Sequence, residues 1–186
     1  MKLTKAYRNA EFLSSEDARS IRILAEYLEP ASRFRRKNIR KAIIFFGSAR
    51  INKLTRRTSR YYREAVALAE KLARWTTQVH AKPERYHICT GGGPGIMEAV
   101  HEGAAKVDRK LNIGLNISLP FEQHVNPHVI KGHALEFHYF FMRKFWFLNV
   151  AHAAVIFPGG FGTLDELFEL LTLTQTGKSS PMPIEL

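Results

Sequence analysis

The chain contains little cysteine, few acidic residues and no long apolar run. Cys89 is the only cysteine among 186 residues, so no disulfide can form within the chain, and we expect a reducing, cytoplasmic compartment. No segment approaches the roughly 18 consecutive apolar residues of a membrane-spanning helix, because Arg143 and Lys144 interrupt the apolar stretch near Phe140. Residues 1–12 also lack the apolar stretch of a signal peptide. We therefore expect neither membrane insertion nor secretion.

The scarcity of acidic residues is concentrated at the N-terminal end. Residues 1–63 contain 17 Lys and Arg but 5 Asp and Glu, and the whole chain has a formal net charge of +11. Such a segment suits nucleic acid, an anionic lipid or an acidic partner, but it also suits an ordinary solvated surface. Because no nucleic-acid-binding motif accompanies the charge, we expect a solvated surface and no nucleic-acid partner.

Beyond residue 40, short apolar runs alternate with segments of helical periodicity. The length and the 45% hydrophobic content predict a single domain, residues 1–186. Apolar runs that alternate with helices indicate a parallel sheet covered on both faces, that is, an α/β Rossmann-like doubly wound fold. The expected strands are 42–46, 86–90, 111–117, 134–137, 153–157 and 182–186. The expected helices are 58–79, 95–107, 138–151 and 163–176.

An additional helix is expected over residues 15–29, within a basic N-terminal extension of residues 1–38. Ser14 or Ser15 is placed to cap it, and Pro30 follows its expected end. The stretch after Pro30 is then a basic connection to the first strand. The apolar residues that recur at helical spacing are Ile21, Leu24, Ala25 and Leu28.

Two glycine-rich turns follow predicted strands at the carboxyl edge of the sheet. They are Gly91-Gly92-Gly93-Pro94-Gly95 and Pro158-Gly159-Gly160-Phe161-Gly162. Glycine permits close approach of the backbone to a ligand, and the N–H groups of a following helix favour phosphate. A tight turn without a ligand is the alternative, but two such turns favour phosphate binding. Neither turn fits the usual ATPase or dinucleotide patterns, since no Lys follows the glycines and Ile96 replaces the last glycine.

Three charged residues stand out beside these turns. Thr163-Leu164-Asp165-Glu166 has the spacing of a capping box, so the local pattern favours capping for Glu166 over catalysis. Arg143 and Lys144 interrupt an aromatic helix. They either extend to the surface or meet an anion, such as a ligand or Glu166. The histidines, including His124, His128 and His133, show no metal-ligand spacing, so we expect no metal site.

The ordered motifs together resemble the LOG (Lonely Guy) family of cytokinin riboside 5′-monophosphate phosphoribohydrolases, often mislabelled as lysine decarboxylases. The resemblance covers about residues 40 to 180 and rests on the segments GGGPGIME, YFFMRK and PGGFGTLDE. The stretch Gly114–Pro127 is similar to the longer bacterial type. The family pattern PGGxGTxxE is met by Pro158, Gly159, Gly160, Gly162, Thr163 and Glu166.

The resemblance implies hydrolysis of the N-glycosidic bond of purine nucleoside 5′-monophosphates to the free base and ribose 5-phosphate, without a cofactor or metal. It implies Arg143 and Glu166 as the catalytic pair, and a homodimer or larger assembly with the site near the dimer interface. A carboxylate beside the sugar fits this chemistry, because breaking the bond builds positive charge on the ribose. The expected substrate- and phosphate-binding residues are Ser48, Gly91, Gly92, Gly93, Gly95, Glu98, Lys144, Gly159, Gly160, Gly162 and Thr163.

Two other functions compete with hydrolysis. A Rossmann-like protein can hold or carry a nucleotide without cleaving it, although such a carrier would not need both Arg143 and Glu166. A decarboxylase would need a pyridoxal-phosphate lysine, for which no local motif is present. Family members usually continue beyond Leu186, so we also expect a chain truncated relative to the family. The preference between AMP and cytokinin nucleotides and the size of the oligomer are left open.

Overall fold

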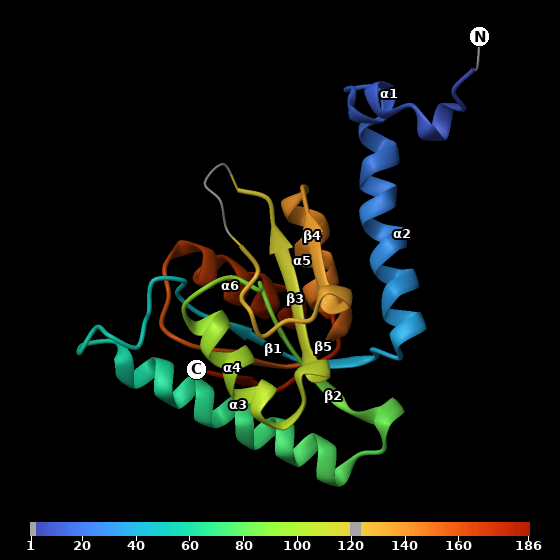
Figure 1. Cartoon of the computed structure of the whole chain (residues 1–186). Helices are drawn as coiled ribbons and strands as arrows, with labels where there is room; N and C mark the ends of the chain where they lie inside the picture. The colour runs from blue at the N-terminus through green and yellow to red at the C-terminus, as the bar shows by residue number, and fades with distance from the viewer. Residues whose placement is uncertain (1–2, 120–123) are drawn as a thin grey trace.

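A parallel sheet of six strands lies between two layers of helices (Figure 1) in the computed structural model, which describes residues 3–119 and 124–186. The strand order is β4-β3-β2-β1-β5-β6, and every neighbouring pair is parallel. The α/β doubly wound prediction is confirmed. The strands are β1 Lys41–Phe46, β2 Tyr86–Thr90, β3 Asn112–Ile117, β4 Ala134–Phe137, β5 Ala151–Ile156 and β6 Ile184–Glu185.

The strand order reverses direction between β1 and β5. From β1 the chain builds outward through β2, β3 and β4, and it then returns to place β5 on the other side of β1. Loops at the carboxyl ends of these two strands diverge to opposite faces, which opens a crevice where such sheets bind ligands. The functional site should therefore lie beyond Phe46 and Ile156, the last residues of the two strands.

Each face of the sheet carries its own core, because side chains alternate along a strand. Ile43 and Phe45 of β1 pack toward α3 (Ser59–Val79) and α4 (Ile96–Asp108). Ile44 and Phe46 point to the opposite face. That face is covered by α2 (Arg19–Lys37), α5 (Phe140–Val150) and α6 (Phe161–Gln175). Burial on both faces explains why β1 is a continuous apolar run in the sequence.

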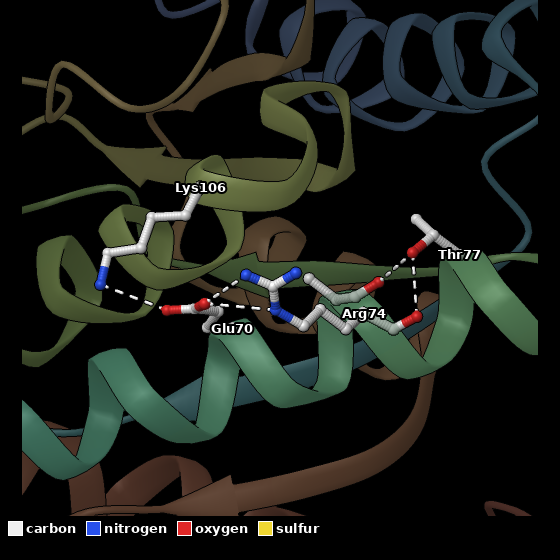
Figure 2. Close-up of polar contacts among 5 residues, drawn as sticks. Glu70, Arg74, Thr77 and Lys106 are labelled. Atoms are coloured by element: carbon white, nitrogen blue, oxygen red, sulfur yellow. Dashed lines mark hydrogen bonds and ion pairs between the residues drawn. The ribbon is translucent and has the colours of Figure 1, made fainter.

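Helices α3 and α4 approach closely enough to exclude a side chain between them. A Cβ at Gly103 would lie 2.1 Å from the carbonyl oxygen of Val66. Figure 2 shows the rim of this contact, where the Glu70 carboxylate of α3 binds Arg74 at 2.7 Å and Lys106 of α4 at 3.3 Å. These side chains are largely solvated, so the ion pairs help to orient the helices and add little stability.

The N-terminal extension forms α1 (Ala10–Ser14) and α2, and here the sequence-based boundaries were wrong. Helix α2 begins after Ala18, without a capping side chain, rather than at a serine. It continues through Pro30 to Lys37, where Asn38 ends it in the left-handed conformation. The basic stretch that was expected to be a connection is therefore the last part of this helix, where positive charge suits the helix dipole.

Proline is tolerated inside α2 because another residue replaces its missing donor. A proline interrupts a helix chiefly by removing the N–H that would bond to the carbonyl four residues earlier, here that of Glu26. In this fold the indole Nε1 of Trp146 in α5 donates to the Glu26 carbonyl at 3.0 Å. Pro30 itself is buried. The helix thus loses no hydrogen bond overall, and the interruption expected from local rules does not occur.

The apolar residues that suggested the N-terminal helix lie on its outer side. Ile21, Leu24 and Leu28 are about half exposed, at 47%, 53% and 52%. The residues of α2 that pack on the core are instead Ile23, Ala31, Pro30 and Phe34. No helix in the described part of the chain has the length and apolar character needed to cross a membrane.

Candidate functional site

A cavity of about 650 Å³ opens at the carboxyl edge of the sheet, beside the reversal between β1 and β5. Its walls come from the turns after β1, β2 and β5 and from the first turns of α5 and α6. It is lined by Phe45, Phe46, Gly47, Ser48, Ala49, Arg50, Gly91, Met97, Ile117, Leu119, Phe140, Arg143, Phe147, Gly160, Phe161, Gly162, Thr163 and Glu166.

Backbone hydrogen bonds join the turns that frame this cavity. The Ser48 N–H donates to the Pro158 carbonyl at 3.1 Å, which links the turns after β1 and β5. The Ser48 carbonyl accepts from the Ile96 N–H at 3.1 Å, which links the turn after β1 to the start of α4. Gly95 makes this approach possible, because it has a φ of +74° and a Cβ there would lie 2.3 Å from the Ser48 oxygen. Main-chain segments packed directly against one another therefore frame the cavity.

Arg143 of α5 and Glu166 of α6 face each other in the wall of the cavity. Their Nη2 and Oε1 atoms are 3.4 Å apart, and the side chains are only 13% and 8% exposed. The guanidinium also lies over the Phe140 ring, 4.6 Å from its centroid. Of the two sequence-based possibilities for Arg143, contact with Glu166 is therefore the one adopted. Within the described residues, its buried Nε has no hydrogen-bond partner.

Burial sets the protonation of this pair. Desolvation raises the pKa of Glu166 to about 7, with Asp165 and Glu169 adding to the shift and Arg143 and Lys144 opposing it. Burial also lowers the pKa of Arg143, while the carboxylate of Glu166 raises it, and an arginine remains charged at neutral pH. A carboxyl group that titrates near neutrality beside a fixed cation is typical of sites that perform chemistry.

The capping-box prediction for Glu166 was wrong. Helix α6 begins at Phe161, with Gly160 as its N-cap and no capping side chain. Thr163 and Glu166 consequently lie inside the helix, and the carboxylate turns toward Arg143 instead of back to the main chain. The Thr163 hydroxyl lies over Gly159, where a Cβ would be 2.0 Å from its Oγ1. Gly159 leaves room for the Thr163 side chain inside the first turn of the helix.

About half of the catalytic and substrate-binding residues predicted from the sequence line the cavity, and the others lie outside its lining. Lining the cavity are Ser48, Gly91, Arg143, Gly160, Gly162, Thr163 and Glu166. Outside its lining are Gly92, Gly93, Gly95, Glu98, Lys144 and Gly159. Lys144 lies on another side of α5, where its Nζ binds Asp165 at 2.8 Å and Glu169 at 2.9 Å.

Asn126 holds the first glycine turn and was not singled out from the sequence. Its amide N–H and its Nδ2 donate to the Gly92 carbonyl at 2.8 and 3.0 Å. The same Nδ2 lies 3.1 Å from the Gly93 carbonyl and 3.0 Å from Nδ1 of His101. Burial lowers the pKa of His101 to about 4, so the ring is neutral and its Nδ1 can accept. Gly92 and Gly93 are thereby fixed by hydrogen bonds within the chain.

Several apolar side chains of the cavity were also not predicted as contacts. Met97, Leu119 and Phe140 line its walls, and Phe161 is 92% exposed at the start of α6. Sequence patterns give little warning of such residues, because an exposed phenylalanine on a helix looks like part of a core. Within residues 3–119 and 124–186, no three His, Cys, Asp or Glu side chains gather as they would around a metal ion.

Comparison with known proteins gives sequence matches over part of the chain. Residues 97–186 match the family model described as possible lysine decarboxylase. A protein of Escherichia coli K12 named pyrimidine/purine nucleotide 5′-monophosphate nucleosidase is 34% identical over 113 residues, which cover 54% of this chain and 24% of that protein. Proteins of the same name from strains O6:H1 and O157:H7 match equally. The chain spans about a quarter of the length of these relatives.

Solved structures with the same fold include that of the structural-genomics target TM1055. It superposes with a TM-score of 0.56 at 23% identity, over 77% of this chain and 72% of that one. A molybdenum-cofactor carrier protein from Chlamydomonas reinhardtii gives a TM-score of 0.46 at 18% identity, over 78% of this chain and 76% of that one. A molybdenum-cofactor binding protein from Rippkaea orientalis gives a TM-score of 0.49 at 18% identity, over 78% of this chain and 90% of that one.

Proposed function

We propose that this chain is a member of the LOG family and hydrolyses the N-glycosidic bond of nucleoside 5′-monophosphates. The family-model match over residues 97–186 supports the proposal. The products are a free base and ribose 5-phosphate. The observation that carries the proposal is the buried contact between Arg143 and Glu166 in the cavity at the carboxyl edge of the sheet. The name of the Escherichia coli relatives agrees with this reaction class.

In the proposed mechanism, Glu166 in its ionised form faces the sugar. Breaking the bond between C1′ and the base nitrogen builds positive charge on the ribose, which a nearby carboxylate stabilises. The same carboxylate orients the water whose oxygen bonds to C1′, and the water gives up a proton as the base gains one. Arg143 holds the carboxylate in place through Nη2. The other N–H groups of its guanidinium remain for the substrate.

We assign the phosphate to the turns and the base to the apolar wall. Gly160, Gly162, Thr163 and Ser48 all line the cavity, and the start of α6 favours negative charge. Arg50, at the mouth of the same cavity, adds a positive charge. The rings of Phe140 and Phe161 offer flat apolar surface of the kind on which bases stack.

A substrate panel tests the proposal. We expect the purified protein to release base and ribose 5-phosphate from AMP, from UMP and from a cytokinin riboside 5′-monophosphate. Adenosine should not react, because it lacks the phosphate that the turns are proposed to bind. The relative rates on the three nucleotides give the base preference. Binding of all three without release of base would contradict hydrolysis and support the alternative of a nucleotide carrier.

The pKa of Glu166 predicts the pH dependence of the reaction. Burial raises that pKa to about 7, and the proposed mechanism needs the ionised carboxylate. We therefore expect kcat to rise with pH through about 7, and to fall about tenfold per pH unit well below it. The measurement is kcat at saturating nucleotide from pH 5 to 9.

A control is needed because a phosphate monoester itself titrates near pH 6. Any dependence on pH that remains in the slow reaction of the Glu166→Gln variant belongs to the substrate. An activity that increases as the pH falls through 7 would instead make Glu166 a proton donor to the leaving base.

The residues of the cavity do not fit pyridoxal phosphate, the cofactor that a lysine decarboxylase would use. Among its described lining residues the cations are Arg50 and Arg143, and none is a lysine. Lys144 follows the lining residue Arg143 directly in the sequence, but it is bound to Asp165 and Glu169 on α6. We therefore derive no step through that cofactor.

Three further expectations complete the proposal. Residues 1–186 form one domain, because both cores use the same sheet. The protein acts as a homodimer or a larger homo-oligomer, which light scattering of the purified chain would test. It acts in the cytoplasm, where its single buried thiol, Cys89, stays reduced.

A further inference from the structure

Helix α2 of the N-terminal extension contacts the helix that carries Arg143. The contact is aromatic at several points. Tyr27 lies against Phe145 and Trp146, with ring centroids 5.4 and 5.9 Å apart, and Phe34 meets Trp146 edge-on at 5.3 Å. Figure 1 shows α2 running beside α5 at one side of the sheet. The extension is therefore fastened to the candidate site through α5.

One residue of α2 also makes polar contacts with α5 in two places. The carboxylate of Glu26 accepts hydrogen bonds from the main-chain N–H groups of His138, at 2.8 Å, and Tyr139, at 3.1 Å. The main-chain carbonyl of the same residue accepts from the indole of Trp146 at 3.0 Å. Along the chain, these contacts stand on either side of Arg143.

The carboxylate of Glu26 binds the segment that leads into α5, at the N-cap residue Tyr139 and at His138 before it. The N-cap residue Tyr139 makes no capping hydrogen bond with its side chain. N–H groups at a helix start lack partners within the helix, and they carry partial positive charge. A carboxylate from another helix supplies both the acceptors and the opposite charge.

The second contact depends on the proline in α2. Without Pro30, the carbonyl of Glu26 would be occupied by the next turn of its own helix. The proline leaves that carbonyl available, and Trp146 uses it. Arg143 consequently lies on a helix whose start and middle are both tied to Glu26.

We propose that Glu26 is a positioning residue for Arg143, so that the N-terminal extension maintains the contact between Arg143 and Glu166. The Nη2–Oε1 distance of 3.4 Å is already at the long end for a hydrogen bond. A small displacement of α5 therefore breaks it. The effect on the reaction rests on the proposed function, whereas the effect on the geometry does not.

Release of Arg143 has a consequence that can be measured at Glu166. The charged groups that act on Glu166 are Arg143 and Lys144 from α5, which lower its pKa, and Asp165 and Glu169 from α6, which raise it. A displacement of α5 by about 1 Å breaks the contact with Arg143 and weakens the first influence. Burial, which is the largest cause of the raised pKa, and the second influence both remain. The pKa of Glu166 should then rise further, a change that a simple loss of stability would not produce.

The test compares Glu26→Ala and Glu26→Gln with the control Glu29→Gln. Glu29 lies on the same helix, but its carboxylate binds Arg33 of that helix. In Glu26→Ala we expect kcat to fall about 10- to 100-fold, as misplacement of a catalytic group by about 1 Å does. The acid limb of the pH profile should move to higher pH. Glu26→Gln keeps one oxygen acceptor and should recover part of the loss, and Glu29→Gln should resemble the parent.

Hydrogen exchange of the His138 and Tyr139 amides and a carboxyl titration of Glu166 by NMR provide readouts that need no turnover. Faster exchange at those amides and a higher Glu166 pKa in Glu26→Ala would support the positioning role even if the parent chain hydrolysed no nucleotide. Unchanged exchange and an unchanged Glu166 titration in both Glu26 variants would overturn it, whatever happens to the melting temperature. If Glu26→Ala does not fold, the Glu26→Gln variant decides between these outcomes.

Discussion

Glutamine in place of Glu166 is expected to lower kcat about 100- to 10,000-fold, the range that a positioned acid–base group contributes. Glutamine has nearly the same shape, but it has no negative charge to stabilise the ribosyl cation and cannot accept a proton from water. Binding of the nucleotide should change only a few-fold, because the phosphate is assigned to the turns rather than to this carboxylate. The reaction rate, not the affinity, carries the effect.

This result would be measured by release of base at saturating nucleotide and by calorimetric titration of a non-reacting analogue. Asp165→Asn is the matched control, because Asp165 is the adjacent acid on α6, half exposed and outside the lining of the cavity. Its rate should stay close to that of the parent. Hydrolysis by Glu166→Gln at the parent rate would contradict the mechanism and leave Glu166 as a structural partner of Arg143.

Alanine in place of Gly95 is expected to destabilise the fold by roughly 2–5 kcal/mol. About 1–2 kcal/mol comes from placing a side chain on backbone that glycine adopts far more readily than other residues, here with φ +74° and ψ −132°. About 1–3 kcal/mol more comes from overpacking, since the new Cβ would lie 2.3 Å from the Ser48 oxygen and 2.6 Å from Ala49. Main-chain atoms on that side cannot rotate away as a side chain would.

Denaturant unfolding would give the two contributions separately. Gly177→Ala has a similar φ of +67° but no atom within 4 Å of the added Cβ, so it should show only the conformational cost of about 1–2 kcal/mol. Gly160→Ala has neither a positive φ nor a close neighbour, so it should cost at most about 1 kcal/mol, from the loss of a glycine at the N-cap of α6. If Gly95→Ala is no worse than Gly177→Ala, the turns after β1 and β2 can separate without cost.

The sheet was predictable from sequence because its strands are buried on both faces. The apolar runs at 42–46 and 86–90 correspond closely to β1 and β2, and the strand expected at 134–137 matches β4. A strand buried on both faces needs apolar residues at every position. It therefore appears in the sequence as a short continuous apolar run. The edge strand β6 was less well predicted and is shorter than expected, because few neighbours constrain it.

The start and end of α2 were not predictable by local rules. Those rules place a helix boundary before Pro30, and they are correct when nothing else donates to the freed carbonyl. Here the donor is Trp146, which is far away in sequence. Only the folded arrangement shows that the cost of the proline is offset.

The candidate site was predictable in its chemistry but only partly in its contacts. Arg143 could be singled out because a cation in an aromatic helix needs a partner. The local spacing at Glu166 favoured capping, and its catalytic role was expected only from the family resemblance. Lys144 follows Arg143 directly but points to other carboxylates. The 100° rotation between adjacent helical residues separates their roles, and the partners on α6 decide which of the two reaches the cavity.

The bond from Trp146 to Glu26 spans 120 residues, and this separation sets an order of events while the chain is being made. Helix α2 leaves the ribosome before α5, and its anchor follows roughly 6–24 seconds later at usual rates of synthesis. Through that interval the apolar side chains of α2 have no native surface to cover them. The N-terminal extension is thus synthesised well before the helix that fastens it in place.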